Sequence, residues 1–401
     1  MNLQKMMIMA GLTAAFGVFA ALPLSAQAYG KLGADRLVNL QADITEDNAG
    51  NGDPDQDLDD GGWDWQISPS AIEHSAGSSP TNLYGIIGRG LRSSRLNPGG
   101  SIPNNGVGLN VTGLDFFYTH YNPFSPNTGP SRTTTALLDA AEAIGADSNI
   151  DSATDIVYLV ELDGDAPGLG FADLARTRYD DKVAAYGSAQ LLGEAIRDYR
   201  GGSGQDGFIG YDLDWLVQAA QALDGAFPTQ GYDADAVAFA QVIADDINNP
   251  TGYFDGENVW EYAYSIGASC SAAALYRTGI EQALMDDLYA SLLTLQNQNG
   301  AFKWNGGSSG NLQTTAYAVF ALALNQQPDI QAAAQDAVDW LLTKQQTNGG
   351  WISSSSEFPT INAEILFAFH LVPPTVRSTG GRQGNWATPP RWYPVARPLN
   401  Y

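Results

Sequence analysis

The sequence contains a single cysteine, Cys270, so no disulfide can form within one chain. The residues around it, 265–274, are small, have a helical spacing and include no basic side chain. A reactive thiolate needs a nearby positive charge that lowers the thiol pKa. We therefore expect Cys270 to be a buried, inert thiol in a helix, and we expect the hydrophobic core to carry the stability of the fold.

Basic residues are also scarce. The 401 residues include 19 Lys and Arg against 44 Asp and Glu, a net charge of −25. Such an acidic chain repels phosphate backbones and anionic membranes, so nucleic acid is excluded as a partner. The sequence indicates no nucleotide or redox cofactor. After residue 24 no apolar run is long enough to cross a bilayer, so no membrane span is expected in the mature chain.

The one long apolar stretch, residues 6–24, follows Lys5 and precedes an A-x-A sequence at 26–28. This order of a positive charge, an apolar run and small residues is typical of a cleavable signal peptide. It predicts cleavage before Tyr29 and export to the periplasm or the medium. The alternative is an uncleaved membrane anchor, which the glycines and the proline inside the stretch disfavour.

Apolar residues at helical spacing predict an all-α protein, and no run alternates as a strand would. The expected organisation is a signal peptide at 1–28, a repeat domain at 29–372 and a Pro/Arg/aromatic tail at 373–401. The tail either docks on the acidic body or stays disordered. The clearest helices are predicted at 82–92, 132–145, 180–200, 211–224, 233–247, 260–278, 281–297, 312–325, 330–345 and 360–371.

A turn of the form Gly-x-aromatic recurs through the second half of the chain, and its aromatic residues, Phe254, Phe302 and Trp351, are 48 and 49 positions apart. Glycine accepts positive φ at a helix end, which lets the next aromatic residue fold back against its helix. The repeating unit is therefore a helix, a glycine-aromatic turn and a second helix. Stacking such pairs side by side buries the faces that one pair cannot bury alone.

Three of these turns place a glutamine before the glycines: Gln56 before Gly61-Gly62-Trp63, Gln296 before Gly300-Ala301-Phe302, and Gln345 before Gly349-Gly350-Trp351. They resemble the QW repeats of the prenyltransferase and squalene-cyclase superfamily. The resemblance implies an α/α toroid of six helix pairs, with inner helices around a central cavity and outer helices around them. It does not indicate one activity, because binding and catalytic proteins share this toroid.

The densest acidic segment, residues 51–61, has carboxylates at every second position. Such oxygen ligands can converge on Ca²⁺, and an exported protein meets high calcium concentrations. The spacing resembles an EF-hand, but Leu58 takes the place of its glycine and an Asp that of its bidentate Glu. The segment either binds calcium or is a solvated acidic loop. The predicted ligands are Asp53, Asp55, Asp57, Asp59 and Asp64.

Residues 57–60 also read Asp-x-Asp-Asp, the general-acid motif of class II terpene cyclases, in which the middle residue, here Asp59, would protonate an alkene or epoxide. The alternative is a chance match inside an acidic turn. This segment lies in a repeat turn, which the toroid places on the outer rim rather than on the cavity wall.

A second acidic group stands at two predicted helix starts: Asp212 and Asp214 with Trp215, and Glu257 and Glu261 with Trp260 and Tyr262. Paired carboxylates with aromatic platforms are typical of glycan-acting enzymes. Acidic residues are also common at helix starts, where they interact with the helix dipole.

We therefore expect an exported α/α toroid, non-catalytic, that binds a ligand or a partner protein at its central cavity with calcium as a further stabiliser. Two enzymatic alternatives stay open: a terpenoid cyclase that uses Asp59, and a glycan-acting enzyme that pairs Asp212 or Asp214 with Glu257 or Glu261. Trp215, Trp260 and Tyr262 are the predicted ligand contacts.

Overall fold

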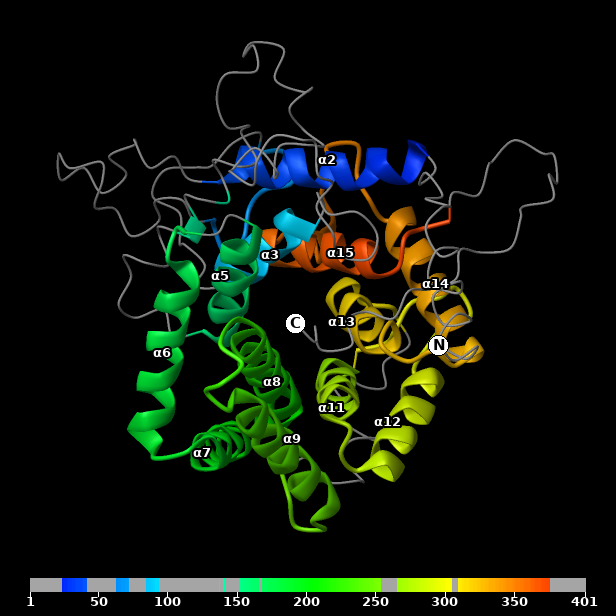
Figure 1. The fold of residues 1–401 in the computed structure, drawn as a ribbon. Coiled ribbons are helices and arrows are strands. Elements are labelled where there is room, and N and C mark those ends of the chain that lie inside the picture. Colours follow the sequence, from blue (N-terminus) through cyan, green and yellow to red (C-terminus); the bar gives the residue numbers. More distant parts are fainter. Residues whose placement is uncertain are drawn as a thin grey trace, which may run out of the picture.

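The computed structural model describes residues 24–41, 63–71, 84–93, 137, 140, 141, 152–165, 168–253, 265–304 and 309–375. Within them, six helices form a closed inner ring, each packed against the next and the last against the first. Figure 1 shows this ring seen along its axis. In ring order the inner helices are α3 (Tyr84–Ser93), α5 (Ala153–Asp165), α8 (Ile209–Ala226), α11 (Ser265–Thr278), α13 (Leu312–Leu322) and α15 (Pro359–Leu371).

The other described helices surround this ring. α6 packs on α5, α9 on α8, α12 on α11 and α14 on α13, while α2 packs on α15 and α7 on α9. This arrangement confirms the predicted all-α class and the α/α toroid. The outer helices are α2 (Leu24–Leu40), α6 (Phe171–Tyr186), α7 (Ala189–Gly202), α9 (Tyr232–Asn248), α12 (Gln282–Thr294) and α14 (Pro328–Thr343). The described strands are a two-residue pair, β1 (Ile352–Ser353) and β2 (Ser356–Glu357).

The predicted glutamine turns form as repeats. Gly300 and Gly349 have φ of 92° and 93°, and an added Cβ would lie 2.2 Å from a backbone oxygen of the neighbouring helix in each case. The Gln296 side chain donates to Gly300 O, and the Gln345 side chain donates to Gly349 O. Glycine is thus required twice over, by backbone conformation and by close packing.

The first repeat differs from the prediction in its glutamine. Trp63 forms a β-bridge with Gln41, as Trp351 does with Gln345. The indole of Trp63 donates to Leu37 O in α2, and the indole of Trp351 donates to Leu341 O in α14, both at 2.8 Å. Gln41 therefore holds the position that the sequence pattern assigned to Gln56, which lies outside the described residues. The spacing rule failed because this turn carries an insertion between its glutamine and its tryptophan.

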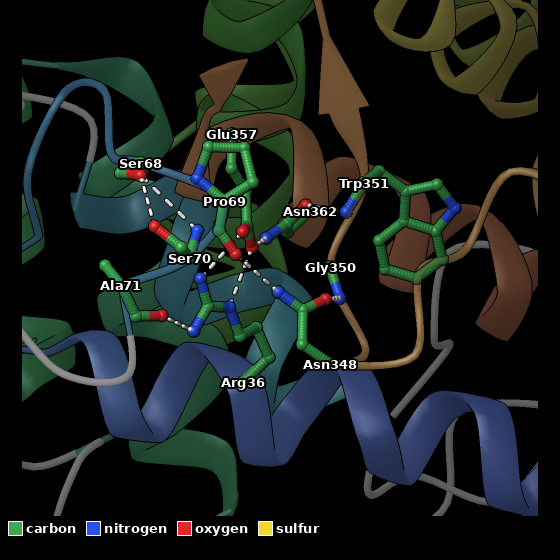
Figure 2. Close-up of polar contacts among 10 residues, drawn as sticks. All are labelled: Arg36, Ser68, Pro69, Ser70, Ala71, Asn348, Gly350, Trp351, Glu357 and Asn362. Atoms are coloured by element: carbon green, nitrogen blue, oxygen red, sulfur yellow. Dashed lines mark hydrogen bonds and ion pairs between the residues drawn. The ribbon is translucent and has the colours of Figure 1, made fainter. Parts of the chain in front are cut away.

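The first described helix, α2, is joined to the last repeat on the outside of the ring. Arg36 on α2 donates from Nε to Glu357 Oε1 at 3.0 Å and from Nη2 to Glu357 Oε2 at 2.7 Å, and it also donates to Ala71 O. Asn362 on α15 donates to the same Glu357 carboxylate, and Figure 2 shows these side chains converging between α2 and the last repeat. A buried bidentate pair of this kind stabilises the contact and also fixes the relative orientation of the two side chains. It joins segments 321 positions apart in the sequence.

The structure differs from the predicted helices at two places: one predicted helix is divided, and one inner helix had not been predicted. The predicted helix 180–200 is two helices, because α6 ends at Gly187, with φ of 92°, and Ser188 caps the start of α7. Helix α5, which the periodicity did not single out, is part of the inner ring. The described parts of the remaining predicted helices agree with the structure to within a few residues.

Among the described residues, no helix is both long and apolar enough to cross a membrane.

Candidate functional site

Side chains from the inner helices meet inside the ring, and several touch helices that are not their neighbours. Arg89 of α3 contacts Gln218 and Trp215 of α8, and Tyr211 of α8 contacts Tyr317 of α13. Contacts between non-adjacent helices place these groups in the ring interior. Two regions can be defined there. The ion-paired half contains Arg89, Arg92, Glu161, Asp165, Asp214, Gln218 and Arg277, and the aromatic half contains Tyr211, Trp215, Tyr317, Phe320, Glu364 and Phe367.

The ion-paired half is a continuous chain of charge-assisted hydrogen bonds. Arg92 binds Asp165 and donates to Glu161 at 2.9 Å, and Glu161 accepts two bonds from Arg89 Nε at 3.0 and 3.2 Å. Arg89 also donates to Gln218, which donates in turn to Asp214 at 2.9 Å. Arg277 completes the chain with a bond of 2.8 Å to Asp214. It links helices α5, α3, α8 and α11.

The arginines set the charge state of this region. Burial by itself raises the pKa of Glu161, but Arg89 and Arg92 outweigh burial and the net pKa is lowered. Burial, followed by the positive charge of Arg92, lowers the pKa of His370 on α15 to about 4. Glu161 is therefore ionised and His370 neutral at neutral pH.

The aromatic half is a series of edge-to-face ring contacts. Tyr211 and Tyr317 lie 5.4 Å apart between ring centroids, Tyr317 and Phe320 lie 4.9 Å apart, and Phe320 and Phe367 lie 5.0 Å apart. The guanidinium of Arg89 covers the ring of Phe367 at 4.2 Å, where the two halves meet. Such arrangements match the quadrupoles of the rings and stabilise the interior beyond simple burial.

Glu364 is the exception in this half. It is 2% exposed, and its Oε1 accepts a 3.1 Å hydrogen bond from Gln313 Nε2. Burial raises the pKa of Glu364 to about 8, and hydrogen bonds from Gln313 and Tyr317 offset only part of that effect. Glu364 is therefore largely protonated at neutral pH, unlike Glu161.

Other polar atoms of this region are buried without a partner. They are the indole nitrogen of Trp215 and the hydroxyl of Ser271 on α11. Each such group destabilises the folded protein by about 1–3 kcal/mol if nothing else bonds to it. Native proteins contain few such groups.

A small, partly open pocket lies at the junction of the two halves. It is lined by Ile86, Arg89, Gly90, Trp215, Phe320, Glu364 and Phe367. In this conformation it has room for about one water molecule. Trp215 and Glu364 both line this pocket, and the surface they present to it is apolar.

Of the predicted site residues, Asp214 and Trp215 lie in the ring interior. Asp214 is bonded to Gln218 and Arg277. Asp212, two positions along α8, points away from it, into a pair with Arg200 at 2.5 Å. Each of these two carboxylates is held by an arginine. Glu257, Glu261, Trp260 and Tyr262 lie outside the described residues, so the predicted glycan site stays a prediction.

The predicted calcium ligands Asp53, Asp55, Asp57 and Asp59 also lie outside the described residues, which places the Asp59 general-acid hypothesis there too. Asp64 is described and is buried. Within the described ranges, no group of three or more His, Cys, Asp or Glu side chains could hold a metal ion.

The prediction for Cys270 is confirmed, because the thiol is free and buried on α11 and burial raises its pKa. Glu364 and Arg89 were missed. The signal for Glu364 was present: it is the only acidic residue in the apolar helix 359–371. Arg89 gave no such signal, because its partners come from helices that are distant in sequence.

Comparison with protein-family models found no match, and comparison with curated proteins found none either. Among solved structures, the type II terpene cyclase MstE from Scytonema in its apo form is similar with a TM-score of 0.48 and 16% identity, over 87% of this chain and 98% of that chain. The ent-copalyl diphosphate synthase from Streptomyces platensis is similar with a TM-score of 0.34 and 15% identity, over 75% of this chain and 70% of that one. Because both TM-scores are below 0.5, the α/α toroid is established by the helix contacts of this chain rather than by these similarities.

Proposed function

We propose that this protein is an exported, non-catalytic α/α toroid that binds a small organic ligand in the interior of its helical ring. The observation that carries the proposal is the combination, in the ring interior, of a buried carboxyl, Glu364, with a series of aromatic rings. This is the mixture of apolar walls and few polar groups that small-molecule sites share.

A calorimetric titration with phenol tests this proposal. Phenol combines an aromatic ring, which suits the aromatic half, with one hydroxyl group. We expect saturable binding to the wild-type protein. Replacing Ile86, which lines the pocket, by phenylalanine fills the space and is expected to weaken binding by about tenfold or more. Val237→Phe is the matched control, because Val237 is exposed on α9. An absence of saturable heat in the wild type, or equal weakening in both variants, would contradict the proposal.

Export is part of the proposal and is supported by the signal-like residues 1–28. Cleavage before Tyr29 would fall inside α2, which begins at Leu24, and would leave Arg36 in place to pair with Glu357. Mass determination of the protein secreted by its native host tests this, and a mature chain that retains residues 1–28 would count against it.

Calcium binding at Asp53–Asp64 is a separate proposal. It predicts heat on adding millimolar calcium to chelator-treated protein.

A second candidate is a cyclase that protonates an isoprenoid. Aromatic rings in the ring interior that can stabilise a carbocation favour it. Incubation with squalene and with geranylgeranyl diphosphate tests it. Cyclised product that disappears in Glu364→Gln or in Asp59→Asn would establish catalysis and identify the acid. No product from either substrate would remove this candidate.

A further inference from the structure

The outer helices fall into two groups by charge. Helices α2, α6 and α7 each contain at least two basic residues, whereas α9, α12 and α14 contain acidic residues and neither Lys nor Arg. The second group packs on the successive inner helices α8, α11 and α13, so these three helices follow one another around the outside of the ring, as Figure 1 shows. We call the surface of α9, α12 and α14 the acidic arc.

The carboxylates of α12 and α14 lie on this arc without positive partners. Asp286, Asp287 and Asp336 are exposed, and no ion pair between described residues includes them. Asp336 lies one helical turn before Asp339 on α14, and like charges at this spacing repel each other. Asp339 is also near the C-terminal end of the helix, where the dipole disfavours a negative charge. A cationic partner on this face would relieve both effects.

The chain that follows α15 is already bound to the outer face of α14. The Gln335 side chain donates to Pro373 O at 3.1 Å, and Thr375 N donates to Asp339 Oδ1 at 2.7 Å. The Thr375 hydroxyl donates to the same carboxylate, and the proline between these two residues is buried. Thr375 is the last described residue, so the described chain ends anchored on the acidic arc.

The 26 residues that follow, 376–401, have the charge that this face lacks: they include four arginines and no acidic residue. Arg377 is two positions after Thr375, so their Cα atoms are at most about 7 Å apart, which places Asp336 within reach of the arginine. Fully extended, 26 residues span about 85–95 Å, and the 16-residue helix α14 is about 24 Å long. The segment is therefore long enough to cross α14 and α12.

We infer that residues 376–401 bind as a strap across the outer faces of α14 and α12, with Arg377 paired to Asp336 and the later arginines to the exposed carboxylates of α12. Arginine suits this role because its planar guanidinium binds carboxylates in a bidentate manner. The anchor at 373–375 keeps the segment at a high local concentration, so individually weak exposed pairs are sufficient. This inference concerns the outside of the ring and is independent of ligand binding in its interior.

Limited digestion of the full chain with chymotrypsin, followed by mass analysis, tests the strap. Cleavage after Trp386 or Trp392 requires the segment to leave the surface, so its rate reports the unbound population. A triple variant removes exposed carboxylates of the arc and keeps Asp339, so the anchor remains. We expect cleavage about fivefold or more faster than in the wild type. The variant is Asp286→Asn/Asp287→Asn/Asp336→Asn.

The matched control makes the same change in net charge on α6 and α7, outside the acidic arc. It removes three exposed carboxylates, and its cleavage rate is expected to equal that of the wild type. All six substitutions are at exposed positions, and thermal unfolding confirms that both variants fold. The control is Asp173→Asn/Asp181→Asn/Asp198→Asn.

A charge exchange tests the individual pair. Arg377→Glu is expected to accelerate cleavage after Trp386, and adding Asp336→Arg to the same chain is expected to restore at least about half of the lost protection. Equal cleavage rates in the wild type and the triple arc variant, or no restoration by the exchange, would overturn the inference. Protection that rises with protein concentration would assign the face to the tail of a second copy and would equally overturn a strap within one chain.

Discussion

Glu161 and Glu364 lie on inner helices of one ring, and their chemistry is opposite. Glu161 accepts hydrogen bonds from Arg89 and Arg92, and its pKa is lowered. Glu364 has only neutral donors, the Gln313 amide and the Tyr317 hydroxyl, and burial raises its pKa to about 8. The comparison shows that the partners contributed by other helices, rather than the residue type, decide whether a buried carboxyl is a structural ion or an available hydrogen-bonding group.

Replacing Glu161 by glutamine should have the largest effect on stability. The variant leaves Arg89 and Arg92 buried without their shared carboxylate, and breaking a buried pair in this way destabilises a protein by about 3–5 kcal/mol. Urea denaturation at pH 7 measures the change. Arg197→Gln is the control, because its pair with Asp198 is exposed. A loss below about 1 kcal/mol would mean that the ion-paired half is dispensable.

Replacing Glu364 by glutamine should stabilise the protein at alkaline pH. The folded-state pKa of about 8 lies above the usual value of 4.5, so the folded wild type binds the proton more tightly than the unfolded chain. Its contribution to stability is complete below pH 4.5 and is lost as pH rises to about 8.

We therefore expect Glu364→Gln to be more stable than wild type by about 2–4 kcal/mol at pH 8, and to show no such gain at pH 4. Denaturation at several pH values measures this difference. The groups facing Glu364 are Tyr211, Cys270 and Tyr317, together with Arg89 across the pocket. A constant difference from pH 4 to pH 8 would show that Glu364 does not titrate in this range.

His370 gives a smaller effect of opposite sign. Its folded-state pKa of about 4 lies below the usual 6.5, so its contribution to stability is present above pH 6.5 and is lost as pH falls to about 4. His370→Gln should remove about 2–3 kcal/mol of this acid sensitivity, while Glu364→Gln should retain it. Thermal unfolding between pH 4 and pH 7 tests the pair of variants, and identical acid profiles for wild type and His370→Gln would refute the expectation.

The smallest effect is expected outside the ring. Asp212 pairs with Arg200 at a partly exposed site, so Asp212→Asn should change stability by about 1 kcal/mol or less. Asp214→Asn, two positions along the same helix, should be worse by about 2 kcal/mol, because it leaves Arg277 inside the ring without its carboxylate. Equal losses of stability in both variants would mean that the Asp214–Arg277 pair contributes no more than the partly exposed Asp212–Arg200 pair.

The repeat pattern predicted the fold well where the turns are short. The turns of Gln296 and Gln345 form as the spacing predicts, because the glutamine, the glycine and the aromatic residue are neighbours in the chain. The same rule misassigned the first turn, where Gln41 pairs with Trp63 across an insertion. Local spacing identifies a turn only while its parts remain local.

The candidate site was less predictable. Trp215 and Asp214 were predicted to lie at the cavity, and both do lie in the ring interior. The role of Glu364 was not predicted, although a lone acid in an apolar helix was visible in the sequence. Its raised pKa depends on the aromatic residues of α8 and α13 that surround it, and no sequence pattern brings those helices together.

The sequence alone determined the helices, their glycine turns and the repeating unit, because hydrophobic periodicity and positive φ are properties of residues close together in the chain. It also determined that one cysteine would be free. The tertiary structure decided which carboxyl is ionised, and that α2 is joined to the last repeat through Arg36 and Glu357. These properties follow from burial and from charges brought together over long sequence separations, so they exist only once the ring has formed.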